Sequence, residues 1–336
     1  MEIPRLSTVK EGLILRKPDD SSLSPNEYTA IHRAAIDLLN KANAWDRLPT
    51  PVPDLLSAAK LRVSPLSAFD PRTLLRYAQD LGDRAARFVK SAIEKVRGVF
   101  DVQADLIHID TSVTETKQNF IKLHEAGHKH IPHQRPMFKW IQDCDKSLSP
   151  DISDQFEREA NIFAAVVFFQ DSRFAQMAAD SSFGIKVPLA LSKKFGASIY
   201  ASLREYVRRN TRACAVIVLN PVEVCPLLGM TSPLRRVEIS PLFQKRFGEL
   251  ILPEQIDGAN PLASFIPLGG RKMSKPGTLP MEDRNGQIVE FVAEGFGTPY
   301  NTFILIHARS DLKTSFVIPP FARGLSLGFS ARSAKS

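Results

Sequence analysis

Apolar residues recur at helical spacing along the first two thirds of the chain. The spacing predicts amphipathic helices at four places, namely residues 26–44, a short segment that Pro51 and Pro53 introduce and that runs to Leu61, residues 72–95 and residues 156–169. From residue 212 onward, short β-branched and apolar runs are separated by glycine and proline, which is typical of strands. The pattern therefore predicts an α+β protein that is mainly helical at first and strand-rich towards its C-terminus.

A further helical segment carries the most informative motif of the chain. His124-Glu125-Ala126-Gly127-His128 has the form H-E-x-x-H. Two histidines four residues apart project from one face of a helix and can share one divalent metal ion, while the glutamate beside the first histidine can act as general base for a water molecule that the metal activates. Apolar neighbours at helical spacing place both histidines on the buried side. Because buried imidazoles without a partner are costly, the pattern favours a metal site over a chance match.

A catalytic zinc ion needs a third protein ligand, and the best acidic candidate lies 29 residues past His128. Glu157 and Asn161 share one stripe of the predicted helix over residues 156–169. This stripe supplies a carboxylate ligand and, one turn further on, an amide that can orient a metal-bound histidine. Glu159 points elsewhere and is expected to be a charge in the first turn of the helix; taken alone, Glu157 fits that role equally well.

Together with the first motif, the block Glu157-Arg158-Glu159-Ala160-Asn161-Ile162-Phe163-Ala164-Ala165 resembles the ImmA/IrrE family of metallopeptidases. The resemblance covers roughly residues 25–210, and the second block is the more specific of the two. It implies a zincin-like domain in which His124, His128 and Glu157 bind zinc and Glu125 is the general base. Many family members continue with a leucine-rich stretch ending in proline, whereas this chain reads Val166-Val167-Phe168-Phe169-Gln170, a difference that removes no catalytic group.

Two short strands, over residues 99–102 and 106–109, are predicted directly before the metal-binding helix. In zinc peptidases of this general build, an edge strand beside the metal holds an extended substrate by backbone hydrogen bonds. The candidate substrate strand consists of Leu106, Ile107, His108 and Ile109. A core strand of a small sheet explains the same pattern equally well. One of His108, His130 and His133 could also donate a hydrogen bond to the tetrahedral intermediate, although such histidines more often lie at surfaces or helix ends.

Residues 185–195 and 199–209 predict two helices joined by a short turn at Gly196, the arrangement of a helix-turn-helix. This region also resembles the three-helix region of the family. Basic side chains here would suit contacts with DNA phosphates, namely Lys193, Lys194, Arg204, Arg208 and Arg209. Such helical hairpins often only pack behind an active site, so the DNA contact stays a hypothesis.

We expect five segments along the chain. They are a flexible arm over residues 1–24, the zincin-like metallopeptidase domain over 25–180, the helix-turn-helix-like region over 181–211, a mixed α/β regulatory or binding domain over 212–325, and a basic tail over 326–336. The strand-rich segment shows no motif that assigns it a more definite role.

Composition and charge limit the kinds of partner and the cellular compartment that we expect. The net charge of +8 favours acidic partners, DNA among them, but a solvated basic surface explains so modest an excess equally well. Three widely spaced cysteines fit a reducing cytosol better than a disulfide framework. No run approaches the roughly 18 apolar residues of a membrane span, and the N-terminus lacks the apolar core of a signal peptide. We therefore expect a cytoplasmic protein with no membrane contact.

The sequence thus predicts a soluble zinc endopeptidase, with Mn²⁺ or Fe²⁺ as the alternative metals. The family resemblance implies a substrate, a helix-turn-helix repressor of the XRE type, whose cleavage relieves repression in stress or during mobile-element induction. Two alternatives stay open. One is a DNA-binding transcriptional regulator with a structural metal site, and the other is a binding module that needs metal to fold but turns over no substrate.

Overall fold

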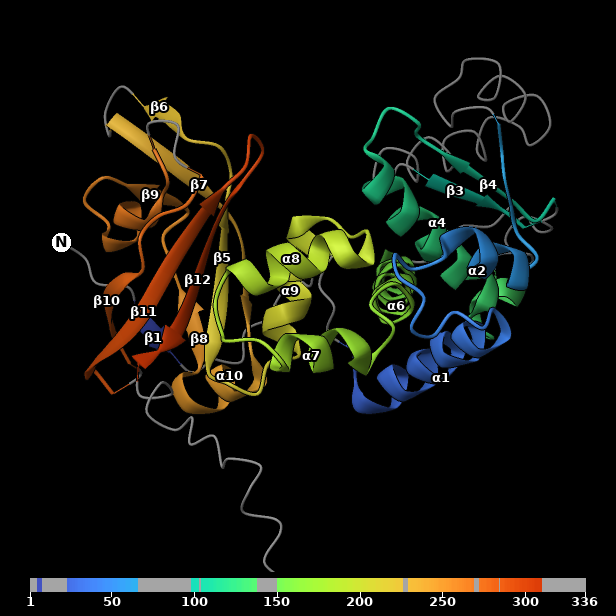
Figure 1. The fold of residues 1–336 in the computed structure, drawn as a ribbon, viewed down its shortest axis with the longest axis horizontal. Coiled ribbons are helices and arrows are strands. Elements are labelled where there is room, and N and C mark those ends of the chain that lie inside the picture. The colour runs from blue at the N-terminus through green and yellow to red at the C-terminus, as the bar shows by residue number, and fades with distance from the viewer. Residues whose placement is uncertain are drawn as a thin grey trace, which may run out of the picture.

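A helical part and a large sheet lie side by side in the computed structural model (Figure 1). The structure describes residues 5–7, 23–65, 98–102, 104–137, 150–225, 229–268, 272–283 and 285–309. The predicted helix over residues 72–95 and the predicted tail over 326–336 lie outside the described residues. The α+β class that the hydrophobic pattern predicted is confirmed.

The helices come first along the chain. They are α1 (Pro25–Lys41), α2 (Val52–Ala58), α4 (Glu115–His130), α6 (Pro150–Phe168), α7 (Ser172–Ala179), α8 (Lys186–Phe195) and α9 (Ile199–Arg208). Ser24 starts α1 with a capping box, in which its hydroxyl accepts from the Glu27 N–H and the Glu27 carboxylate accepts from the Ser24 N–H. Helix α6 begins at Pro150, earlier than the predicted start at residue 156. None of the described helices is both long and apolar enough to cross a membrane.

A three-stranded sheet precedes and flanks α4. Its order is β2 (Arg62–Val63), β4 (Leu106–Ile109) and β3 (Gly98–Asp101). Strand β4 pairs in parallel with β2 and antiparallel with β3, so it is the central strand. This corrects the prediction that Leu106–Ile109 is an edge strand to which a substrate strand is added. Backbone groups on both sides of β4 already pair within the sheet. The alternative interpretation, a core strand of a small sheet, is therefore confirmed.

The C-terminal part is built around a nine-stranded sheet that is antiparallel except for one pair. Its strands run in the order β6 (Glu223–Cys225), β7 (Gly229–Ile239), β5 (Cys214–Leu219), β12 (Thr302–Ala308), β11 (Ile288–Gly297), β10 (Gly277–Glu282), β1 (Arg5–Ser7) and β8 (Glu249–Ile251), with β9 (Gln255–Asp257) beside β7. Strand β1 comes from the predicted flexible arm and pairs with β10 and β8, which corrects that prediction for Arg5–Ser7.

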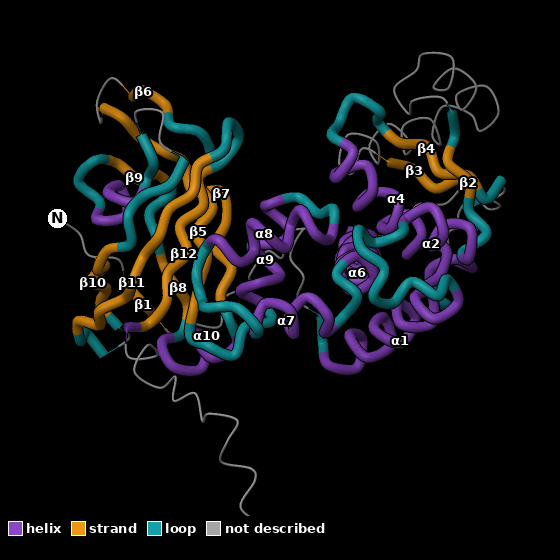
Figure 2. Tube along the Cα trace, in the orientation of Figure 1, coloured by secondary structure: helices purple, strands orange, loops and turns teal. Residues whose placement is uncertain are grey.

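Strands β5 and β12 are buried on both faces, which explains their largely apolar sequences. On one face, residues such as Val216 and Leu305 join the core of the helical part. On the other face, residues such as Ile217 and Ile306 pack in a second core with α10 (Pro241–Phe247) and the 3₁₀ helix η1 (Pro261–Phe265). Helices α7, α8 and α9 therefore lie between α6 and the sheet (Figure 2).

A partly buried ion-pair cluster ties α9 to the sheet. Arg204 donates from Nε to the Glu238 carboxylate of β7 at 2.8 Å, and Arg236 and Arg208 lie 3.5 and 3.6 Å from the same group. Burial alone raises the pKa of Glu238, but the surrounding arginines outweigh it and hold that pKa below its usual value. A carboxyl group with a lowered folded-state pKa stabilises the fold above its unfolded pKa, and this contribution is lost as the pH falls through the folded pKa.

We expect Glu238→Gln to lower the free energy of unfolding by about 2 kcal/mol at pH 7, because it removes a charged acceptor from partly buried guanidinium groups. The difference from wild type shrinks as the pH falls below the unfolded pKa of glutamate, near 4.3. Urea titrations at pH 7 and in the acid range measure it. Glu290→Gln is the matched control, because the Glu290–Arg309 pair is exposed and its loss costs less than about 1 kcal/mol. A difference that stays the same at both pH values would contradict the assignment.

Candidate metal centre

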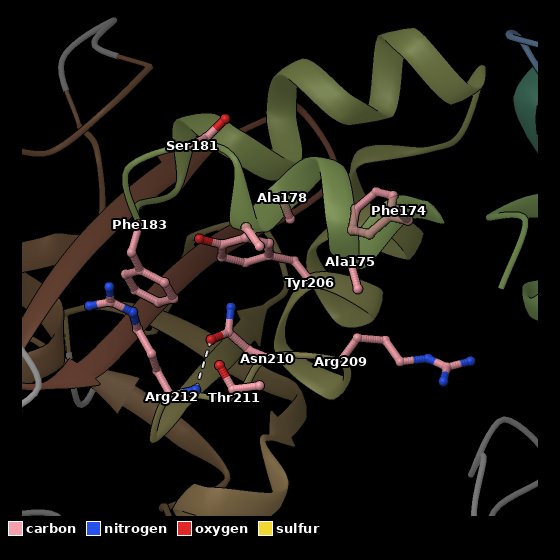
Figure 3. A pocket seen from close by; sticks show the side chains of 11 residues that line it. Phe174, Ala175, Ala178, Ser181, Phe183, Tyr206, Arg209, Asn210, Thr211 and Arg212 are labelled. Carbon is pink, nitrogen blue, oxygen red and sulfur yellow. Dashed lines mark hydrogen bonds between the residues drawn. The ribbon is translucent and has the colours of Figure 1, made fainter. Parts of the chain in front are cut away.

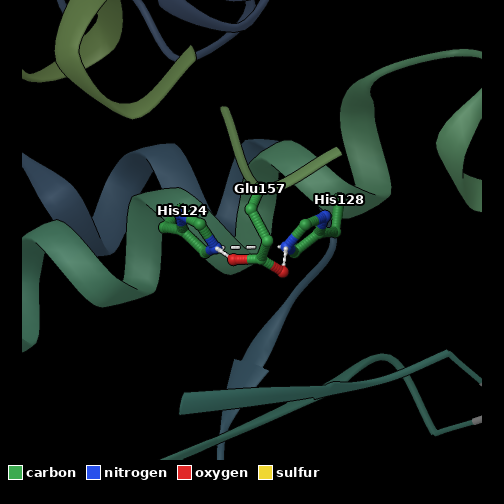
Figure 4. A group of neighbouring side chains, drawn as sticks. All are labelled: His124, His128 and Glu157. Atoms are coloured by element: carbon green, nitrogen blue, oxygen red, sulfur yellow. Dashed lines mark hydrogen bonds and ion pairs between the residues drawn. The ribbon is translucent and has the colours of Figure 1, made fainter. Parts of the chain in front are cut away.

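Two helices bring three potential metal ligands to one point (Figure 4). The Nε2 atoms of His124 and His128, both on α4, lie 3.1 Å apart. One carboxylate oxygen of Glu157 on α6 lies 3.3 Å from His124 Nε2, and the other lies 3.7 Å from His128 Nε2. The imidazoles are buried, whereas the Glu157 side chain is 22% exposed, so the group borders solvent on the Glu157 side.

The three side chains can come together because α4 packs closely on α6. Gly127, inside the H-E-x-x-H motif, faces α6, and a Cβ atom at that position would lie 3.1 Å from the Phe163 ring and 3.3 Å from Ala160 Cα. A side chain at this position would require the Phe163 ring or the α6 backbone to shift by a few tenths of an ångström, so glycine suits this close approach. The same pair of helices therefore carries all three ligands at short range.

The outer nitrogens of both histidines are held by amide oxygens. His124 Nδ1 lies 3.1 Å from Asn161 Oδ1, as the shared stripe on α6 predicted, and His128 Nδ1 lies 2.7 Å from Gln134 Oε1. When each Nδ1–H donates to its amide oxygen, each Nε2 presents a lone pair to the shared point. No pattern in the sequence indicates Gln134, because it lies beyond the end of α4.

The donor set and its spacing fit zinc. Ligands about 2.1 Å from a tetrahedral Zn²⁺ lie roughly 3.4 Å from one another. The closest approaches here run from 3.1 to 3.7 Å, although a different Glu157 oxygen is nearest to each ring, and one ligand atom from each residue lies within 4.8 Å of the others. Two imidazole nitrogens and one carboxylate oxygen also form the protein ligand set of catalytic zinc sites, which leave a further position open.

The two imidazoles have pKa shifts of opposite direction. Burial opposes charging of His124, but the neighbouring Glu157 outweighs it and raises the pKa of that ring. Burial and the adjacent His124 lower the pKa of His128 to about 4, so this ring is neutral at pH 7. Because zinc binds neutral imidazole, zinc affinity falls as the pH drops and the rings take up protons.

Glu125 is a buried carboxyl group that faces β3. Its side chain is 3% exposed, and the Phe100 N–H of β3 donates to it. The other oxygen, Oε1, has no hydrogen-bond partner among the described residues. Burial raises the pKa of Glu125 to about 7, which is suited to a group that accepts and returns a proton near neutral pH.

A comparison with protein-family models identifies the kind of domain that carries these three residues. Residues 83–204 match the model of peptidase family M78, the IrrE N-terminal-like domain, and this span includes both ligand-bearing helices. The chain carries an M78 metallopeptidase domain. A search of curated proteins gave no match. Among solved structures, a Mycobacterium tuberculosis transcriptional regulator is similar at 10% identity and a TM-score of 0.47, over 87% of this chain and 78% of that one.

Glu159, two residues past the candidate ligand Glu157, is not the first-turn charge that we predicted. It lies well inside α6, because the helix begins at Pro150, and it is 1% exposed. Its Oε2 accepts from Gln134 Nε2 and from His133 Nε2. The M78 domain therefore holds a second buried carboxyl group directly behind its histidine ligands.

Two of the three additional histidines contact carboxyl groups of the protein, and the third lies buried in the small sheet. His130 lies 2.9 Å from Asp37 of α1, and His133 lies 2.6 Å from Glu159. His108 is buried on the central strand β4, where burial lowers its pKa. Nothing in these contacts supports the prediction that one of the three donates to a tetrahedral intermediate.

The hairpin at the end of the M78 domain has the predicted helices α8 and α9, with Gly196 at a φ of +71° in the turn. Lys193 and Lys194 are exposed at the end of α8. The arginines of α9 are instead in ion pairs, namely Arg204 with Glu238, Arg208 with Glu205 and Glu238, and Arg209 with Glu205 and Asp171. Helix α9 packs against β5 and β7, and the contact of these basic residues with DNA stays a prediction.

A cavity of about 280 Å³ lies where α7 and α9 meet the start of β5 (Figure 3). Phe174 and Tyr206 line it together with Arg212, whose guanidinium lies 5.6 Å from the centroid of the Phe183 ring. None of the three ligand residues lines this cavity, so it is separate from the metal centre.

We expect Gly127→Val to destabilise the protein by about 1–3 kcal/mol, because the new side chain overpacks the contact with Phe163 and Ala160. Separating the helices also moves Glu157 from the imidazoles, so zinc affinity falls. Urea unfolding and a chelator-competition titration measure the two effects. Helix propensity does not explain such a loss, because valine is a better helix former than glycine by roughly a few tenths of a kcal/mol. Unchanged zinc affinity in Gly127→Val would show that the close approach is not needed.

Glu157→Ala should remove most of the bound metal, because two imidazoles alone leave the cation without its charged ligand. We expect close to one zinc per chain in wild type after loading and desalting, and far less in the variant, by elemental analysis. Asp154→Ala, three residues earlier on α6, should keep the wild-type content. Equal zinc content in Glu157→Ala and wild type would exclude Glu157 as a ligand.

Proposed function

We propose that this protein is a zinc-dependent endopeptidase and that its substrate is a helix-turn-helix repressor of the XRE type. The observation that carries the first half is the convergence of His124, His128 and Glu157 within the M78 domain, with their ligand atoms all within 4.8 Å of one another. Glu125, buried next to one of these histidines, supports it further.

The chain's own residues account for binding and proton transfer. His124, His128 and Glu157 would hold the metal, which when bound acts as a Lewis acid toward the scissile carbonyl and an attacking water molecule. Glu125 accepts a proton from that water as its oxygen bonds to the carbonyl carbon. Glu125 then gives the proton to the amide nitrogen as the C–N bond breaks, so one water is consumed and a carboxyl and an amine are formed. Asn161 and Gln134 keep both imidazoles oriented throughout.

The substrate class rests on the resemblance of the two sequence blocks to the ImmA/IrrE family, in which peptidases act on repressors of this kind. Cleavage of such a repressor would relieve transcriptional repression during stress or mobile-element induction. The solvent-bordering position of Glu157 supports access of a protein segment to the site. A role for the C-terminal sheet in regulation or binding belongs to the same proposal.

We expect Glu125→Gln to lower peptide hydrolysis by about 10²–10⁴-fold, because the amide cannot take the proton from water. A proteome-derived peptide library, digested with zinc-loaded wild type and variant, measures this whatever the natural substrate is. The zinc content of the variant should stay at the wild-type level, since Glu125 is not a ligand. Glu115→Gln, at an exposed position in the first turn of α4, should cleave like wild type. Hydrolysis by Glu125→Gln at the wild-type rate would remove Glu125 as the base.

The substrate class has its own test. A purified XRE-type repressor encoded next to this protein's gene should be cut at one site by the zinc-loaded protein and left intact by Glu125→Gln. Cleavage of library peptides together with complete resistance of such repressors would retain the peptidase and reject the repressor as its substrate.

A further inference from the structure

A buried amide connects one metal ligand to a second carboxyl group of the M78 domain. Gln134 is fully buried and lies between His128 of α4 and Glu159 of α6. Its Oε1 lies 2.7 Å from His128 Nδ1, and its Nε2 donates both to Glu159 Oε2 and, at 3.3 Å, to the Phe156 carbonyl. His128, Gln134 and Glu159 are all buried, so this series of contacts is shielded from solvent.

The hydrogen-bond partners of the Gln134 side chain determine which end of its amide faces His128. A carboxylate and a backbone carbonyl are both acceptors, so Glu159 and the Phe156 carbonyl together require the NH₂ end of Gln134 on their side. The oxygen end of Gln134 then faces His128, and an amide oxygen can only accept. His128 must therefore carry its hydrogen on Nδ1, which leaves the Nε2 lone pair directed at His124 and Glu157.

Glu159 is itself held in place. Its Oε2 also accepts from His133 Nε2 at 2.6 Å, and its Oε1 accepts from Gln155 Nε2 at 3.0 Å. Because Glu157 and Glu159 lie two residues apart on α6, one helix supplies both a metal ligand and the anchor for another ligand. If the anchor were lost, the Gln134 amide could turn and present its NH₂ group to His128, which would favour the tautomer with hydrogen on Nε2, where the metal binds.

We propose that Glu159 and Gln134 are positioning residues that keep His128 in its metal-binding tautomer. The inference rests on the proposed function only in that the site binds a divalent metal; it does not depend on the substrate. It differs from a purely structural role, in which Gln134 and Glu159 would stabilise the contact between α4 and α6 without affecting the metal.

The test compares metal affinity with fold stability. Zinc affinity is measured by chelator competition, Co²⁺ coordination by visible absorption of the cobalt-substituted protein, and stability by urea unfolding of the metal-free form. We expect Gln134→Ala and Glu159→Gln to lower zinc affinity by about 10–100-fold and to alter the cobalt spectrum. Gln170→Ala is the matched control, because Gln170 is equally buried and hydrogen-bonded to Arg47 and Asp46 but contacts no metal ligand. It should lose stability and keep wild-type zinc affinity.

A double variant that exchanges the side chains of Gln134 and Glu159 provides a second test if a single variant folds poorly. Gln134→Glu combined with Glu159→Gln presents a carboxylate oxygen to His128 Nδ1 and an amide donor behind it but gives up the contact with the Phe156 carbonyl, so the double variant should recover part of the zinc affinity lost in Gln134→Ala. Zinc affinity that falls as much in Gln170→Ala as in Gln134→Ala, or a swap with no recovery, would overturn the proposal.

The result is separable from the proposed function. Wild-type zinc affinity in Gln134→Ala, with wild-type peptide hydrolysis intact, would reject the positioning role and leave the peptidase. Loss of affinity in Gln134→Ala, in a protein whose wild type binds zinc and hydrolyses no peptide, would retain the positioning role and reject the peptidase.

Discussion

The metal centre depends on how closely α4 and α6 approach each other. At Gly127 the two helices are so near that a methyl group would lie in contact with the Phe163 ring and the Ala160 backbone. Because Glu157 lies one turn before Ala160, this approach sets the distance from its carboxylate to the two imidazoles. The residues between the histidines of an H-E-x-x-H motif are often regarded as free, but here a larger residue at position 127 would disturb the helix contact that brings Glu157 to the two imidazoles.

The rest of the fold supports this helix pair. Helix α6 leads through α7 and α8 to α9, and α9 is fixed on the sheet by the ion pairs of Glu238 with Arg204 and its neighbours. Residues of β5 and β12 complete the apolar core of the helical part on that side. Helices α8 and α9 thus lie between α6 and the sheet, and Arg204 and Arg208 of α9 pair with Glu238 of β7.

The ligands could be predicted because they lie on helices, where a period of 3.6 residues places each side chain on a known face. The same periodicity predicted Asn161 but not Gln134, since Gln134 follows the end of α4 and its position depends on tertiary contacts. Glu159 was misplaced because α6 starts at Pro150, which turns an expected first-turn residue into an interior one. The prediction for Leu106–Ile109 was wrong because the pairing of β4 with the two-residue strand β2 is a long-range choice that no local pattern encodes.

The most direct test of a centre made of two imidazoles and one carboxylate is X-ray absorption spectroscopy of the zinc-loaded protein at the zinc edge. We predict a first shell of nitrogen and oxygen only, at about 2.0–2.1 Å, with the outer scattering of two imidazole rings. A sulfur shell near about 2.3 Å, or a shell of oxygen alone with no imidazole scattering, would contradict this prediction.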